Sequence, residues 1–378
     1  MSHTKTISLR RAVSDTAAAA VLLAACVLLI LYRTDAQKGV YTGVCTCLNM
    51  LVPSLFPFVL LACLLTRSRA AALLFRPLAP IMRHVFRLPA CAAPALLFGL
   101  TAGYPVGAKI TAALYADGRL NREQAARLLC FCTAPGYAFS MYAGTQLTGG
   151  THTGTLLFAA CAAAPLILGL ILSRFAPKPA KEAEILPAGG SFTEAVRDGV
   201  SAMVSMCGFV VVFSAVLALL QGSGIFRAVT ALLARFGMTI PGAGAAVICF
   251  LEVTAGISHC AYWQLSPAVT AFGLGFAGLC IHLQLFSFFS KTGFPLGKSI
   301  YLLTRLLNGL LSAAVYTALA RIFPASAEAA ASSAPLKAVP AGSPALSAAL
   351  LLLSLFFLLF CAQKNTSEAA RIRFKSRS

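Results

Sequence analysis

One apolar stretch of this chain, from Gly99 to Lys109, reads GLTAGYPVGAK, and a weaker version, EVTAG, follows at Glu252 to Gly256. Glycine and proline at these spacings interrupt a helix. Hydrocarbon offers no hydrogen-bond partners, so irregular backbone at membrane depth occurs only where it is buried in protein or lines a cavity. The two stretches therefore predict two broken membrane helices beside an internal cavity.

The two breaks lie in halves that share one order of segments, which indicates an internal duplication. Thr101-Ala-Gly103 aligns with Thr254-Ala-Gly256. In each half a long apolar helix precedes a basic amphipathic stretch, 67–88 or 226–238, then the broken helix and a glycine-containing apolar segment. An odd number of spans per half gives inverted repeats and an even number does not, so the orientation stays open. Paired breaks of this kind are typical of transporters, where they hold the substrate.

The composition is that of a polytopic membrane protein, because 59% of the 378 residues are hydrophobic and only 11% are charged. The formal net charge is +19. Lys and Arg lie mostly in short loops and tails between apolar runs, as cytoplasmic anchoring predicts, so we expect no nucleic-acid partner. The basic tail from Arg371 to Arg377 predicts a cytoplasmic C-terminus.

About 20 apolar residues cross a bilayer as a helix. On this measure we expect an all-α polytopic membrane protein with about eight to ten hydrophobic segments, some of them re-entrant rather than spanning. The candidates are 16–32, 45–66, 91–115, 124–146, 153–173, 199–221, 240–263, 266–289, 299–322 and 345–361.

Two polar stretches divide the chain. The first segment follows Arg10 and Arg11 and is interpreted as an uncleaved anchor rather than a signal peptide. The predicted parts are an N-terminal tail and anchor (1–38), a first repeat (39–173), a polar linker (174–198), a second repeat (199–322), an Ala/Pro-rich linker (323–344) and a C-terminal hydrophobic helix with a basic tail (345–378).

Charged side chains inside membrane segments are costly and are functional candidates by default. Lys109 closes the first break, where free N–H groups at a helix N-terminus attract an anion; the alternative is a lysine snorkelling to the interface. Glu252 is the only acidic residue in the apolar core. In a low dielectric its carboxyl takes up a proton more readily, so it is a candidate for coupling a proton or sodium ion. The alternative is that Glu252 forms a structural ion pair with Lys109 or Lys291.

Further polar residues near the breaks complete the predicted site. His282 and Gln284 follow a glycine-containing run and are candidates for orienting a solute, although an intramembrane histidine is otherwise a packing residue. Ser54 lies between two prolines. The predicted substrate-binding residues are Ser54, Gly103, Tyr104, Pro105, Gly107, Lys109, Thr254, Gly256, His282 and Gln284, with Glu252 as the ion-coupling residue.

The sequence offers little support for an enzymatic activity or for a metal site. It contains no Gly-x-Ser-x-Gly, no Walker lysine motif and no His-Glu-x-x-His. Its 13 cysteines show no Cys-x-x-Cys pair and no His/Cys metal spacing. We therefore expect no enzyme, no metal and no cofactor, and transport that is passive or driven by an ion gradient.

Six motifs follow one another between about Met50 and Arg321: Pro53–Phe58, Gly103–Lys109, Glu123–Leu129, Gly208–Phe213, Leu251–Gly256 and Phe276–Gln284. Taken in this order they resemble the YlbJ (SpoVV) sporulation integral membrane proteins, which belong with the nucleoside-recognition gate domain proteins. One departure is Cys132-Thr-Ala-Pro-Gly136, where relatives usually show a Cys-Asn-x-x-Gly-Pro type of break.

The resemblance implies two gate-like repeats and kinship with concentrative nucleoside transporters. It also implies a spore-former's protein, in the mother-cell-derived membrane around the forespore, that helps to move dipicolinic acid. We expect a transporter of this or a related small aromatic anion, working by alternating access at the paired breaks. The expected partners are that anion, the lipid bilayer, a proton or sodium ion and other sporulation membrane proteins. The alternatives are a non-transporting membrane scaffold, a nucleoside-type transporter, and an intramembrane enzyme or lipid flippase.

Overall fold

Every regular element in the described part of the chain is a helix, as the sequence predicts. These elements belong to one compact unit, Met1–Ser332, while the second unit, Ser333–Ser378, lies outside the described residues. The predicted helix and tail over 345–378 and most of the linker 323–344 therefore also lie outside them. The computed structural model describes residues 2–68, 74–177 and 191–324.

The first half follows an N-terminal helix, α1 (Ser2–Leu31). Its elements are α2 (Arg33–Thr46), η1 (Cys47–Leu51), α3 (Val52–Arg67), η2 (Arg76–Leu78), η3 (Ile81–Val85), η4 (Ala90–Ala92), α5 (Ala93–Thr101), α6 (Tyr104–Ala116), α7 (Arg122–Phe131), α8 (Tyr137–Thr148) and α9 (Thr151–Arg174). The second half consists of α10 (Phe192–Gly222), α11 (Ile225–Ala234), α12 (Ile240–Leu251), α13 (Val253–Tyr262), α14 (Pro267–Phe276), α15 (Gly278–Phe288) and α16 (Lys298–Ile322).

Each half contains a long helix, a short stretch that joins it to the next element, two broken helix pairs and a final long helix, in that order. The pairs α5–α6 and α12–α13 contain the two predicted breaks. The pairs α7–α8 and α14–α15 form a second set. Each predicted hydrophobic segment within the described residues corresponds to one helix or to one such pair, which confirms the all-α fold.

Five described helices are long and apolar enough to cross a membrane, and a bent pair would make six. The other predicted hydrophobic segments in the described residues include broken helices, whose parts are too short to span the roughly 30 Å of hydrocarbon alone. For example, α12 and α13 have 12 and 10 residues. The five are Arg33–Leu65, Thr151–Arg174, Phe192–Gly222, Pro267–Phe288 and Lys298–Ile322, and the bent pair is Arg76–Val85 with Ala90–Thr101, at 109°.

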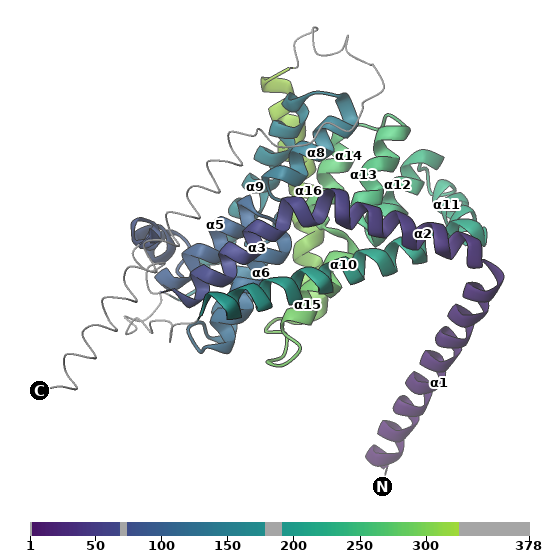
Figure 1. Ribbon diagram of the computed structural model, residues 1–378, viewed down its shortest axis with the longest axis horizontal. Helices are drawn as coiled ribbons and strands as arrows, with labels where there is room; N and C mark the ends of the chain where they lie inside the picture. Colours follow the sequence, from purple (N-terminus) through teal and green to yellow (C-terminus); the bar gives the residue numbers. More distant parts are fainter. Residues whose placement is uncertain (1, 69–73, 178–190, 325–378) are drawn as a thin grey trace, which may run out of the picture. The chain divides into compact units, whose positions relative to one another are not determined.

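The first long helices of the two halves, α2–η1–α3 and α10, lie antiparallel (Figure 1). A Cβ atom at Gly39 would lie 2.7 Å from the Cβ of Ala218, and further along the Cys47 Sγ is 3.7 Å from the carbonyl oxygen of Cys207. Gly43, one turn after Gly39, packs equally closely on α10. Small residues four apart allow this close approach between membrane helices.

The last long helices, α9 and α16, are also antiparallel. Thr153 interacts with Tyr316, and Cys161 interacts with Ser312. Leu156, Leu157 and Tyr316 belong to one buried apolar cluster between these helices. Because both sets of equivalent helices run in opposite directions, the two halves have opposite orientations, which is the relation expected of inverted repeats.

Three boundaries differ from the predicted ones. The segment predicted from residue 45 begins at Arg33, because the packing of α2 on α10 extends the helix through a polar turn. Helix α10 begins inside the predicted linker 174–198, where the Ser191 hydroxyl accepts a hydrogen bond from the Glu194 N–H and caps the helix. In the stretch 67–88, Arg67 belongs to α3 and a separate short helical segment, Arg76–Val85, ends before Leu88.

Candidate functional site

The first predicted break lies at Gly103, between α5 and α6. Gly103 has φ = 119°, a conformation that side chains other than glycine rarely adopt. A Cβ atom at Gly99 or Gly107 would overlap the carbonyl oxygen of Cys132. The Ala134 N–H donates a hydrogen bond of 3.2 Å to the Gly99 carbonyl. The breaks of α5–α6 and α7–α8 therefore pack directly on each other.

The second predicted break lies at Glu252, which has extended backbone between α12 and α13. The residue is 3% exposed, and its carboxylate accepts hydrogen bonds from the N–H groups of Thr254 (2.9 Å) and Ala255 (2.7 Å). Glu252 thus caps the N-terminus of α13, where the helix dipole favours a negative charge. This cap explains how the apolar interior holds an acidic residue, and Lys109, one of the two alternative partners, bonds instead to the Asp198 carbonyl.

The break between α14 and α15 packs on the end of α12. Ala277 has φ = 81°, in the left-handed region, and a Cβ atom at Gly278 would lie 2.8 Å from the carbonyl oxygen of Cys249. Within each half, therefore, one broken pair presents glycine to a backbone carbonyl of the other. Close backbone contacts fix both breaks in place.

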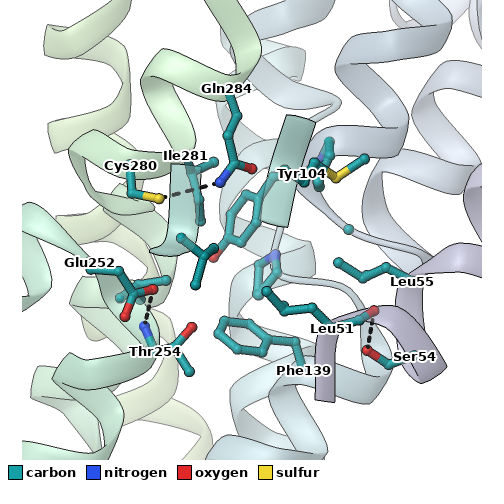
Figure 2. Close-up of a pocket in the computed structure, with 16 residues that line it drawn as sticks. Leu51, Ser54, Leu55, Tyr104, Phe139, Glu252, Thr254, Cys280, Ile281 and Gln284 are labelled. Carbon is teal, nitrogen blue, oxygen red and sulfur yellow. Dashed lines mark hydrogen bonds between the residues drawn. The ribbon is translucent and has the colours of Figure 1, made fainter. Parts of the chain in front are cut away.

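A cavity of about 50 Å³ lies between the breaks of the two halves. In Figure 2 the ring of Tyr104 occupies the middle of the view, with Glu252 and Thr254 on one side and Leu51 and Leu55 on the other. Typical small-molecule sites measure roughly 300–1,000 Å³, so this cavity has room for water rather than for a planar solute. The lining residues are Leu51, Ser54, Leu55, Gly103, Tyr104, Pro105, Pro135, Phe139, Met206, Val210, Glu252, Val253, Thr254, Cys280, Ile281 and Gln284.

Most of the predicted site residues line this cavity. The polar ones are largely held within their own helices: the Ser54 hydroxyl donates to the Met50 carbonyl at 2.6 Å, and the Gln284 side chain donates to the Cys280 sulfur at 3.3 Å. The predicted residues that the structure brings together here are Ser54, Gly103, Tyr104, Pro105, Glu252, Thr254 and Gln284.

The other predicted site residues lie elsewhere. The Lys109 ammonium donates a hydrogen bond of 2.9 Å to the Asp198 carbonyl in α10, so it ties two helices together. Gly107 and Gly256 are packing glycines, because a Cβ atom would overlap Cys132 or Cys249. His282 is fully buried beside aromatic rings, and neither of its ring nitrogens has a hydrogen-bond partner.

The chain is similar to a protein of Bacillus subtilis (strain 168) described as "Sporulation integral membrane protein YlbJ". The two are 26% identical over 307 residues, which cover 72% of this chain and 74% of that protein. The resemblance to YlbJ is confirmed. No family model and no solved structure matches the chain, so the gate-domain part of the resemblance stays a prediction. The likeness to YlbJ and the apolar helices both support a multi-pass membrane protein.

One charged residue of this YlbJ-like chain was missed by sequence reasoning. Arg305 of α16 is fully buried, and its Nη1 donates to the carbonyl (3.0 Å) and hydroxyl (2.6 Å) of Thr133. Its Nη2 donates to the Gly275 carbonyl, which also accepts a 2.9 Å hydrogen bond from Asn308. An arginine within an apolar segment, one turn before an asparagine, was the signal available in the sequence.

Apolar lining residues were also missed. Phe139, Met206 and Ile281 face the cavity, but nothing distinguishes them in the sequence from apolar residues that face lipid. Their position follows from how α8, α10 and α15 pack, which is information that the sequence alone does not contain.

Proposed function

We propose that this chain is a membrane transporter rather than an enzyme, and that it carries dipicolinic acid or a related small aromatic anion during spore formation. The observation that carries the proposal is the small cavity between broken helices of two oppositely oriented halves. Discontinuous helices from two repeats are where secondary transporters bind substrate. The similarity to YlbJ supports a membrane role in sporulation.

Transport in this proposal works by alternating access. A planar solute does not fit a cavity of about 50 Å³, so the halves separate to admit it from one side and then from the other. Tyr104 and Phe139 offer aromatic faces to a flat ring. The hydroxyl of Thr254 and the amide of Gln284 line the same cavity and supply polar contacts.

The charge on the cavity wall gives a role to Glu252. The lining residues include this carboxylate but no Lys, Arg or His. A dianion beside an ionised carboxylate is repelled, so in this proposal Glu252 is protonated or paired with a cation while the solute is bound. Uptake is then coupled to a proton or sodium ion, and acidification on the side of entry increases it.

The test is uptake of labelled dipicolinate into proteoliposomes that contain the purified full chain, with proton and sodium gradients imposed in turn. We expect saturable uptake that one gradient accelerates. E252Q should lose the gradient dependence, because an amide cannot exchange a proton. K109M should keep uptake, because Lys109 lies outside the cavity wall. Absence of dipicolinate uptake under both gradients would rule out this substrate.

A nucleoside-type transporter is the second candidate. A cavity wall without a cation suits a neutral solute with a flat base at least as well as an anion. Uptake of labelled nucleosides in the same proteoliposomes separates the two proposals. Uptake of a nucleoside but not of dipicolinate would favour the second, and uptake of neither would favour the non-transporting scaffold.

A further inference from the structure

We propose that Tyr104 and Arg305 form a latch that fastens the two halves of the protein and keeps the cavity too small for a solute. The proposal builds on the proposed function, because only a protein whose cavity opens needs a latch. Both residues are buried, and each donates hydrogen bonds from one half to a backbone carbonyl of the other.

The first part of the latch starts from the wall of the cavity. Tyr104 is the first residue of α6, directly after the Gly103 break, and its ring lines the cavity. Its hydroxyl donates a hydrogen bond to the Leu274 carbonyl in α14 of the second half. Any separation of the first break from α14 must therefore break this bond.

The second part runs in the opposite direction, from α16 of the second half. Arg305 donates to the Thr133 carbonyl and hydroxyl, two residues before the cavity-lining Pro135. It also donates to Gly275, which lies near the C-terminal end of α14. Thr133 follows the C-terminal end of α7, so the guanidinium bridges two helix C-termini, whose dipoles favour a positive charge.

The two hydrogen bonds to Thr133 are what Arg305 contributes between the halves. Helices α14 and α16 are already joined without it, because Asn308 donates to the Gly275 carbonyl and because Gly309 packs closely on Phe272. The hydrogen bonds that the structure gives to Arg305 all go to uncharged groups. Arg305 therefore contributes hydrogen bonds that join the two halves, rather than contacts that are needed within the second half.

The experiment measures how fast buried cysteines react when each part of the latch is removed. Cys280 lines the cavity and is 1% exposed, and Cys132, next to Thr133, is fully buried. The full chain is purified in detergent and treated with N-ethylmaleimide, and modification of each cysteine is followed by mass spectrometry of its peptide. This readout needs no substrate.

We expect Y104F and R305Q each to raise the labelling rate of Cys280 and Cys132 about five- to thirtyfold, since losing a buried hydrogen bond shifts an opening equilibrium by such a factor. The matched controls are Y41F, which alters an exposed tyrosine of α2, and R321Q, which alters an exposed arginine of α16. Neither control should change the rate.

T133V removes the hydroxyl that accepts from Arg305, together with its 3.2 Å hydrogen bond to the Leu129 carbonyl in α7, so it tests the contact with Arg305 if R305Q does not fold. Unchanged labelling in folded Y104F and T133V overturns the latch. Faster labelling in these variants supports the latch even if the wild-type protein takes up neither dipicolinate nor a nucleoside. The two proposals therefore fail separately.

Discussion

Single glycines at the breaks decide how closely the backbone segments approach. At Gly99 and Gly107 a methyl group would occupy the position of the Cys132 carbonyl oxygen. At Gly208, in the middle of α10, no heavy atom lies within 4 Å of an added Cβ atom. The same change from glycine to alanine therefore has opposite consequences at these positions.

We expect G99A to destabilise the folded protein by about 3 kcal/mol or more, because the backbone of the neighbouring break must move to accommodate the methyl group. G208A is the matched control, and its effect should be neutral or slightly stabilising, because alanine favours a helix. Thermal unfolding of both variants in detergent measures the difference. Equal melting temperatures would contradict the packing of the two breaks.

Helix geometry explains which predicted residues reach the cavity. Successive residues of an α-helix project about 100° apart. Lys109 lies five positions after Tyr104 and projects about 140° away from it, so both cannot face one cavity. His282 likewise lies two positions before Gln284, on nearly the opposite face. The sequence identified the helices that carry the site, whereas choosing one face of each required knowing how they pack.

The close contact between α2 and α10 is a feature of two whole helices. Gly39 and Gly43 present a smooth face to α10, and Cys47 meets Cys207 along the same line of contact. Lipid tails are as apolar as these helices, so the hydrophobic effect does not drive their association. Close packing of small residues therefore contributes much of the free energy of association. The contact aligns the first helices of the two halves.

We expect G43L to push α2 away from α10 and to reduce oxidative cross-linking between Cys47 and Cys207 severalfold, because a Cβ atom at Gly43 would lie 2.8 Å from the Val211 backbone. G208L adds the same side chain where α10 has open space, and should leave cross-linking unchanged. Mass spectrometry of the cross-linked peptides measures both. Wild-type levels in G43L would contradict the antiparallel packing.

Breaks were predictable where the residue type itself interrupts a helix. Gly103 with Pro105, and the run from Cys132 to Gly136, contain such residues. The break at Ala277 was not predictable, because alanine rarely adopts a positive φ and does so here only in a closely packed context. In the stretch 67–88 the charge pattern indicated a helix, and the structure has a helical segment over Arg76–Val85 that contains both Pro77 and Pro80.

The charges of the protein as a whole give it an orientation in the membrane. Hydrogen bonds gather several arginines at one end of the bundle: Arg87 donates to the carbonyl groups of Arg174 and Ala176, Arg127 donates to the Arg87 carbonyl, and Arg122 donates to the Pro295 carbonyl. At the opposite end the described residues carry fewer cations, namely Arg33, Lys38, Arg227, Arg235 and Arg321. Cytoplasmic loops are enriched in Lys and Arg, so we expect the first end to face the cytoplasm.

Cysteine substitutions at exposed positions test this orientation. T151C lies at the start of α9, opposite the basic end, and should react with a membrane-impermeant maleimide in intact cells. D117C lies between α6 and α7, at the basic end, and should react only after permeabilisation. Mass spectrometry of the two peptides reports the result. The reverse pattern would invert the assigned orientation.

The antiparallel packing of equivalent helices has a consequence for energetics. If each half can adopt the shape of the other, then exchanging the two shapes turns a cavity that opens on one side into a cavity that opens on the opposite side. Two states related in this way contain nearly the same set of contacts, so they lie close in free energy. A carrier of this design has little built-in preference for import or export, and the gradients across its membrane determine the direction of net flow.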